Sequence, residues 1–226
     1  MNFDVVLEVV LSLIAVFMAI VLHEVAHGYV AFRLGDPTAR NRGRLTLNPL
    51  AHIDPVGTIL VPLGLAVVSF LFGTRLFLFG WAKPVPINPG NFRNPLRGML
   101  FVALAGPVTN IALALVTAGV FRLIWLGVSS IELASGGFGF HLLEAVLILL
   151  SRFVLYNLLL AVFNLIPIPP LDGSRVLMYF LKAEGRRFLL SVERYGFLIL
   201  MALLYLGGLS FLFRAVDRIS RVLLGV

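Results

Sequence analysis

The feature that most constrains this chain is a series of long apolar stretches that recur along the whole sequence. They cover residues 5–34, 56–79, 100–126, 142–166 and 188–213. A helix needs about 20 mostly apolar residues to cross the hydrocarbon core of a bilayer, and each stretch is long enough. Charged residues make up only 13% of the chain, and the mean hydropathy is +1.01. A soluble domain carries about twice that charged fraction, so the sequence predicts an integral membrane protein with a single domain, residues 1–226.

One of these stretches is expected not to cross the bilayer. Residues 56–79 contain Pro62 and Gly64 and lie between two basic loops, residues 33–44 and 83–97. Basic loops mark the cytoplasmic side of a membrane, so both ends of this stretch are expected there, in a re-entrant or interfacial segment. The predicted fold class is therefore an all-α polytopic membrane protein with about four transmembrane helices and this additional segment.

Charge and cysteine content exclude several partners and chemistries. The net charge of +7 comes from basic residues in loops that face anionic lipid, so the lipid bilayer and not nucleic acid is the expected partner. The chain has no cysteine, which excludes disulfides, a thiol nucleophile and cysteine metal ligands. Residues 1–4 lack the basic region of a signal peptide, and the first span is expected to be retained.

Ionisable residues gather near the end of the first apolar stretch. His23 and His27 lie four residues apart, so both imidazoles project from one face of a helix and reach a single zinc ion. Glu24 is about 100° further round the helix, where a general base for zinc-bound water would sit. Ionisable groups are costly in an apolar span and are usually functional there. The alternative is that these residues only solvate the helix end.

A catalytic zinc site needs a third protein ligand and keeps a position for water. Asp172 is the favoured candidate, because it follows a proline-rich break that leaves open backbone at the membrane end of the fourth span. Otherwise Asp172 caps the short helix after it. His52 is a second candidate ligand, although a solvated loop histidine is the simpler interpretation. His141 is expected to be structural, and Arg152, in mid-span, to snorkel or to find a partner.

Two further motifs accompany the H-E-x-x-H pattern. One lies on a later span and reads Asn164-x-x-Pro167-x-Pro169-x-Leu171-Asp172-Gly173. The other lies between them and reads Ala105-Gly106-Pro107-x-x-Asn110. Together these motifs resemble the site-2 protease family, the intramembrane zinc metalloproteases. The chain looks like a minimal prokaryotic member, with no room for the PDZ or CBS domains of larger relatives.

The resemblance implies a function and an assignment of roles. It implies a zinc-dependent endopeptidase that hydrolyses peptide bonds in or near transmembrane segments of membrane protein substrates. His23, His27 and Asp172 would hold one Zn²⁺ per chain, and Glu24 would serve as base and later as proton donor.

Asn110 and Asn164 are assigned as catalytic amides. A carboxamide near the metal donates to an oxyanion or to the substrate backbone. For each, the alternative is a hydrogen bond between packed helices. Polar and apolar residues alternate at 44–48 as in a short strand, and together with residues 79–87 this region resembles the small membrane-associated β-element of the family. Such an element would hold an unwound substrate by adding it as a strand, or would be a plain hairpin.

The location expected is the plasma membrane, with the active site toward the cytoplasmic side. Counting spans from an acidic N-terminal flank places Asp172 near the level of His27 on that side, although the basic C-terminal tail does not fit the count. A membrane metal transporter or a non-proteolytic scaffold is the alternative function. A transporter favours inverted repeats, which the sequence does not show, and a scaffold would lack Glu24 or a ligand.

Overall fold

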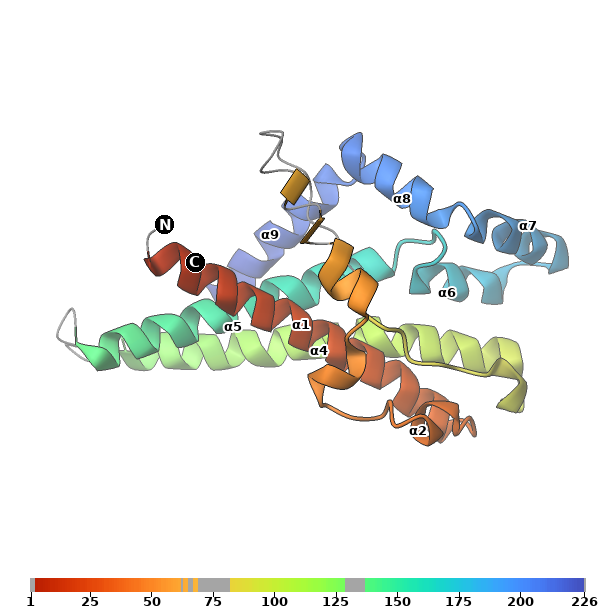
Figure 1. Ribbon diagram of the computed structural model, residues 1–226, viewed down its shortest axis with the longest axis horizontal. Coiled ribbons are helices and arrows are strands. Elements are labelled where there is room, and N and C mark those ends of the chain that lie inside the picture. Colours follow the sequence, from red (N-terminus) through yellow and green to blue (C-terminus); the bar gives the residue numbers. More distant parts are fainter. Residues whose placement is uncertain (1–2, 62, 65–66, 69–81, 129–136, 226) are drawn as a thin grey trace.

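Three long helices form the centre of the protein. The computed structural model describes residues 3–61, 63–64, 67–68, 82–128 and 137–225. The long helices are α1 (Phe3–Arg33), α4 (Pro95–Val128) and α5 (Phe138–Asn164). Each is long and apolar enough to cross a bilayer. Figure 1 shows α1 and α5 running in one sense and α4 in the other. The predicted all-α, multi-pass architecture is confirmed for the described residues.

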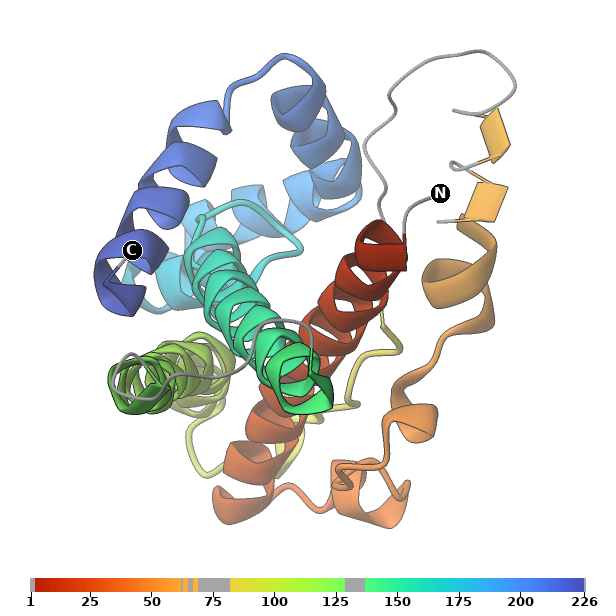
Figure 2. The ribbon, with the colours of Figure 1, turned by 90° about the vertical axis from the view of Figure 1, so that its left-hand side faces the viewer.

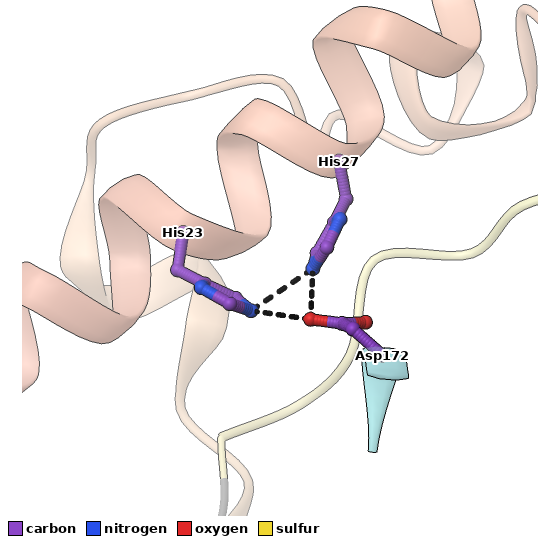
Figure 3. Close-up of side chains that lie close together, drawn as sticks. All are labelled: His23, His27 and Asp172. Atoms are coloured by element: carbon purple, nitrogen blue, oxygen red, sulfur yellow. Dashed lines mark hydrogen bonds and ion pairs between the residues drawn. The ribbon is translucent and has the colours of Figure 1, made fainter. Parts of the chain in front are cut away.

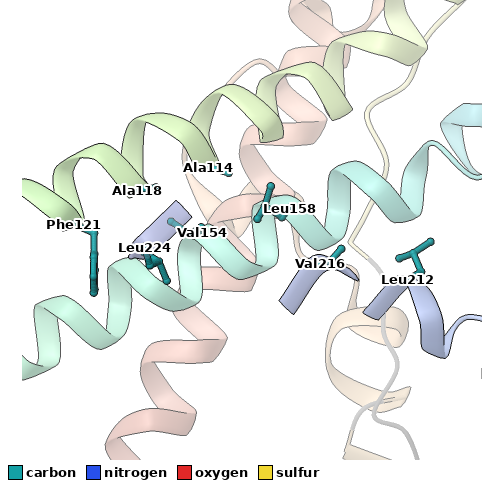
Figure 4. Packing of buried hydrophobic residues seen from close by; sticks show 8 residues of the cluster. All are labelled: Ala114, Ala118, Phe121, Val154, Leu158, Leu212, Val216 and Leu224. Carbon is teal, nitrogen blue, oxygen red and sulfur yellow. The ribbon is translucent and has the colours of Figure 1, made fainter. Parts of the chain in front are cut away.

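Small side chains let the three helices approach one another closely. Ala15 and Ala19 on α1 and Ala114 on α4 are almost fully buried. Viewed along the long axis, α1 and α5 cross beside α4, and α9 (Ser210–Leu224) lies on the outer side of α5 (Figure 2). The apolar face of α9 joins α4 and α5 in one core (Figure 4), which contains Ala114, Ala118, Phe121, Val154, Leu158, Leu212, Val216 and Leu224.

Shorter helices lie in the connections before α4 and directly after α5. They are α2 (Thr38–Asn41), η1 (Pro49–His52), η2 (Pro55–Leu60), η3 (Pro89–Asn91) and α6 (Asp172–Phe180). Among them, α6 packs against α4 and α2 against α1. Figure 1 shows α2 and α6 toward the same end of the three-helix centre.

The last predicted span, residues 188–213, is not one straight helix in the structure. The chain there forms α7 (Ala183–Glu193) and α8 (Gly196–Tyr205), which bend by 70° at the break between them. Gly196 begins α8 against the proline-rich turn, because a Cβ there would lie 1.9 Å from the carbonyl oxygen of Pro169. Hydropathy counts apolar residues and does not register such a bend. The described residues therefore hold three long spans, or four if the bent pair forms one.

The predicted β-element is wrong for the described part of both segments. Residues 44–48 and 82–87 contain no strand. Carbonyl groups that a ladder would pair accept hydrogen bonds from the Arg44 guanidinium instead. Prolines alternate along the second segment and have no N–H to donate to a neighbouring strand. Residues 79–81 lie outside the described residues.

Most of the predicted re-entrant stretch, residues 56–79, also lies outside the described residues. Its described beginning, η2, is capped by Asp54, whose carboxylate accepts hydrogen bonds from the first N–H groups of the turn. The N–H of Lys83 donates to the carbonyl of His52 at 3.0 Å, so the chain returns to its starting point after the stretch. This return is what a re-entrant segment requires, and the topology stays a prediction.

Candidate active site

Two helix positions and one turn bring three potential metal ligands together. His23 and His27 project from one face of α1, and their Nε2 atoms lie 3.0 Å apart. Asp172 Oδ2 lies 3.1 Å from the first and 3.2 Å from the second (Figure 3). Both histidines are buried, and the aspartate is half-buried. Within the described ranges, this is the one cluster of three such side chains that could hold a metal ion.

The positions of these three atoms fit a zinc ion. Bonds of about 2.0–2.2 Å in a tetrahedral site separate the ligand atoms by roughly 3.3 Å. The separations found here are 3.0, 3.1 and 3.2 Å. Two imidazoles and one carboxylate are a donor set typical of catalytic zinc, and they leave a fourth position for water.

Asp172 reaches the histidines because the chain turns back sharply after α5. Residues 165–171 form the turn, and Asp172 is the first residue of α6. Gly173 makes the turn possible, because a Cβ there would lie 2.2 Å from the carbonyl oxygen of Leu165.

Hydrogen bonds on the far side of each imidazole fix its orientation. His27 Nδ1 donates to the carbonyl oxygen of Val102 at 2.7 Å, and His23 Nδ1 lies 2.5 Å from Asn110 Oδ1. Acceptors at both Nδ1 atoms leave both Nε2 lone pairs free for a metal. Gly106 of α4 lies against the Nε2 edges of both rings, since a Cβ there would be 2.6 Å from each Nε2. The glycine of the middle motif therefore lets α4 approach the histidines.

Glu24 borders a cavity of about 320 Å³ beside the three ligands. Its carboxylate accepts a hydrogen bond from the N–H of Val85 at 2.8 Å. The cavity is lined by His23, Glu24, His27, Pro84, Val85, Ile87, Met99, Val102, Ala103, Asn164, Pro170, Asp172 and Arg175. The predicted base is thus adjacent to the ligand group without belonging to it.

Residues 82–92, called the anchored segment below, form the wall of the cavity that faces Glu24. Arg44, which is buried, holds one end of this segment. Its Nη2 donates to the carbonyl oxygens of Lys83 at 2.7 Å and Pro84 at 3.3 Å. These bonds fix the chain immediately before the N–H group that contacts Glu24.

Asp36, just beyond α1, holds the other end of the anchored segment. Its carboxylate is fully buried and accepts from the N–H of Asn88 at 2.7 Å and from Asn91 Nδ2 at 2.6 Å. Thr38 donates to it as well, through its N–H and its hydroxyl. Burial raises the pKa of Asp36, but the hydrogen bonds from Thr38, Asn88 and Asn91 outweigh burial and lower it overall.

The two predicted catalytic amides lie in different places. Asn164 lines the cavity, and its Nδ2 donates to a carbonyl of its own helix at 3.0 Å. Asn110 is fully buried between helices. Its Oδ1 faces His23, and its Nδ2 donates to Asn157 Oδ1 at 2.7 Å and toward the carbonyl of Ala19 at 3.4 Å. These contacts associate Asn110 with His23, a potential metal ligand, rather than with the cavity.

The other polar candidates lie outside the ligand group. His52 is fully buried, and its Nε2 donates to the carbonyl of Thr46 at 2.9 Å. Arg152 pairs with Glu8 across α5 and α1, which is the partner expected of a charge in mid-span. His141 is exposed at the start of α5.

Three residues in this arrangement were not singled out from the sequence. Asn157 is an amide in an apolar helix, the same signal that identified Asn110. Asp36 follows the end of α1, where an acidic residue has no obvious partner along the chain. Arg44 was taken only as a basic loop residue and as the start of the predicted strand, because its carbonyl partners are far away in sequence.

Known proteins are similar to this chain in sequence. The family described as "Peptidase family M50" matches residues 128–207. The chain is 38% identical over 194 residues to "Putative zinc metalloprotease YwhC" of Bacillus subtilis, which covers 84% of this chain and 78% of that protein. It is 30% identical over 197 residues to "Putative zinc metalloprotease Rip2" of Mycolicibacterium smegmatis, covering 85% and 66%. No solved structure matches significantly.

A zinc protease built into membrane spans is the class that this geometry and these relatives define. The chain belongs to peptidase family M50, since its match with the Bacillus subtilis relative extends over most of both proteins. The predicted site-2 protease membership, zinc cofactor and metalloprotease activity are thereby confirmed.

Proposed function

We propose that the protein hydrolyses peptide bonds in or near transmembrane segments of membrane protein substrates, from the cytoplasmic side of the plasma membrane. The observation that carries this proposal is the position of the ligand group. Two ligands lie within α1, the third follows the end of α5, and α4 closes the site from behind. A substrate therefore meets the site among membrane spans rather than on a soluble surface.

His23, His27 and Asp172 would hold the zinc ion. When bound, zinc polarises the scissile carbonyl and makes water acidic enough to be deprotonated near neutral pH. Glu24 takes the proton from the attacking water and then gives it to the leaving amine. To do so, its carboxylate exchanges the hydrogen bond from Val85 for one from water.

The two amides are proposed to act differently. Asn164 lines the cavity, so its Nδ2 donates to the substrate carbonyl or backbone once it leaves the carbonyl of its own helix. Asn110 acts through His23, because both ends of its carboxamide already have partners among the helices. This role replaces oxyanion donation as our proposal for Asn110.

The test is cleavage by the purified full-length chain in lipid vesicles. The substrates are a peptide with one apolar membrane-spanning segment and a soluble peptide of the same sequence around the bond that is cut. We expect mass spectrometry to place the cut within or next to the apolar segment, and the soluble peptide to be cut far more slowly. Equal cleavage of both peptides would contradict an intramembrane substrate.

The orientation has its own test, because the chain has no native cysteine to interfere with thiol labelling. Asn48 and Asn91 are exposed and flank the predicted re-entrant stretch. Cysteines introduced at both positions should react with a membrane-impermeant thiol reagent only when the reagent reaches the cytoplasmic side of the membrane. Labelling from opposite sides would overturn the topology, and labelling of both from outside would reverse the orientation of the site.

A further inference from the structure

Asn157 is a fully buried amide in the middle of α5 that the proposed function does not use. A carboxamide in an apolar environment needs partners for both its ends. Its Nδ2 donates to the carbonyl oxygen of Phe153 at 2.8 Å, and its Oδ1 accepts from Asn110 Nδ2 at 2.7 Å. Asn110 in turn contacts His23, so a chain of hydrogen bonds runs from α5 through α4 to a metal ligand on α1.

The carbonyl of Phe153 fixes the direction of this chain. A carbonyl oxygen only accepts, so Asn157 turns its Nδ2 toward it and its Oδ1 toward Asn110. Asn110 must then present its Nδ2 to Asn157 and its Oδ1 to His23. The carbonyl of Ala19, 3.4 Å from Asn110 Nδ2, agrees with this direction. His23 Nδ1 consequently carries the proton, and Nε2 keeps its lone pair for the metal.

His27 is held in the same Nδ1-protonated form by a single hydrogen bond. Its Nδ1 donates directly to the backbone carbonyl of Val102 in α4. His23, by contrast, depends on two side chains in succession, Asn110 and Asn157. The orientation of His23 is therefore the one that a side-chain substitution on α5 can change.

We infer that Asn157 is a positioning residue of the zinc site, which acts through Asn110 to fix the protonated nitrogen and the ring orientation of His23. The inference rests on the proposed zinc site. It differs from a purely structural role in one respect. An amide that only joins α4 to α5 stabilises their packing whatever its direction, whereas this chain requires an acceptor facing Asn110.

The experiment compares zinc affinity in full-length variants in detergent, measured by competition with a chelator. Asn157→Leu removes the acceptor, and we expect zinc affinity to fall about 10–100-fold, as for lost partners of other metal-bound histidines. Asn157→Asp is nearly isosteric. At this depth the neutral acid donates to Phe153 and accepts from Asn110, so we expect affinity within about threefold of wild type. Ser151→Ala is the matched control, because its hydroxyl donates only within α5.

A second measurement follows His23 itself. In the metal-free protein, the ¹⁵N shifts of labelled histidine should show the Nδ1–H tautomer for His23 in wild type and a mixture in Asn157→Leu. Cobalt substitution should shift the visible spectrum in the same variant. A role limited to packing would lower the melting temperature and leave both signals unchanged.

The outcomes separate this inference from the proposed function. If wild type holds a full equivalent of zinc and Asn157→Leu binds it equally well, the inference is overturned and the proposed function stands. If Asn157→Asp loses as much zinc affinity as Asn157→Leu, an acceptor facing Asn110 does not maintain zinc binding, and the inference is again overturned. A wild-type protein that binds no zinc would overturn both. If Asn157→Leu does not fold, Asn157→Ala serves as the removal variant.

Discussion

The two walls of the active site are built in different ways. The wall behind the metal ligands is helical, and it holds the imidazoles through the backbone carbonyl of Val102 and the buried amide of Asn110. The wall facing Glu24 is the anchored segment, which is irregular apart from η3. This wall is held by two distant side chains, Arg44 and Asp36.

This difference in how the two walls are held suggests different roles for them in zinc binding and in cleavage. Contacts within packed spans are released only if helices move apart, whereas hydrogen bonds to one irregular segment can open locally. On the proposed zinc site, the helical wall would govern zinc binding, and the anchored segment would govern the hydrogen bond made by Glu24. We expect substitutions at the ligands and behind them to change zinc content, and substitutions at Glu24 and its wall to change cleavage while zinc stays bound.

The largest effect is expected from Asp172→Ala. It removes one of three ligands, so zinc content should fall from one equivalent to near zero, and cleavage should be lost with it. His52→Ala is the control, because His52 lies outside the ligand group. Elemental analysis of both purified variants decides the matter. A full equivalent in Asp172→Ala, with zinc lost from His52→Ala, would return Asp172 to the role of a helix cap.

Glu24→Gln is the variant that should best distinguish cleavage from zinc binding. The amide keeps the shape of the side chain but cannot take a proton, so we expect cleavage to fall roughly 10²–10⁴-fold. Zinc content should remain at one equivalent, because Glu24 is not among the ligands. Cleavage within a factor of a few of wild type would remove Glu24 from the role of base. Zinc loss would show that the walls are not independent.

Asp36→Asn should loosen one end of the anchored segment. The side-chain NH₂ group of the asparagine replaces a carboxylate oxygen that accepts from a donor. One buried hydrogen bond is therefore lost, at a cost of about 1–3 kcal/mol. We expect faster amide hydrogen exchange in residues 82–92 and unchanged zinc affinity. Exchange at the wild-type rate would mean that Asp36 does not hold the segment.

The same carboxylate predicts a dependence on pH. The pKa of Asp36 is lower in the folded protein than in the unfolded chain. Its contribution to stability is therefore complete above the unfolded value of about 4, and it is lost as the pH falls through the folded value. Exchange in residues 82–92 of wild type should rise in that acidic range. Asp36→Asn should not show this rise.

The smallest effect is expected from Arg44→Ala. The guanidinium donates to two carbonyls, and its loss should free the start of the anchored segment and lower cleavage about two- to tenfold. Zinc affinity should not change. The exposed neighbour Arg42 provides the control, since Arg42→Ala removes the same charge from the same loop. Equal losses in both variants would assign the effect to charge rather than to anchoring.

The sequence predicts the helical wall far better than the other. His23 and His27 follow from helix periodicity, and Asp172 from its motif, because these signals are local. Asn157 shows only that it needs a partner, and which partner depends on how α4 and α5 pack. The 188–213 stretch has the hydropathy of a span, but a break at Gly196 is decided by the turn packed against it.

The anchored segment shows where local patterns mislead. Alternating polar and apolar residues at 44–48 are typical of a strand, yet the described chain there pairs with no neighbouring strand. Arg44 and Asp36 make their contacts with residues far along the chain. No periodicity encodes such contacts, so they were out of reach of the sequence alone.

The closeness of α4 to the imidazoles has a consequence for inhibitors. At Gly106 there is no room even for a methyl group beside the two Nε2 atoms. A chelating compound therefore cannot pass between Gly106 and the imidazoles, and the space open to it is the cavity that Val85 and Glu24 help to line. Its zinc-binding group would replace the Val85 hydrogen bond to Glu24, and its remaining atoms would lie along the anchored segment. Selectivity among related enzymes would thus come from residues 82–92, while the metal-binding group alone would give little.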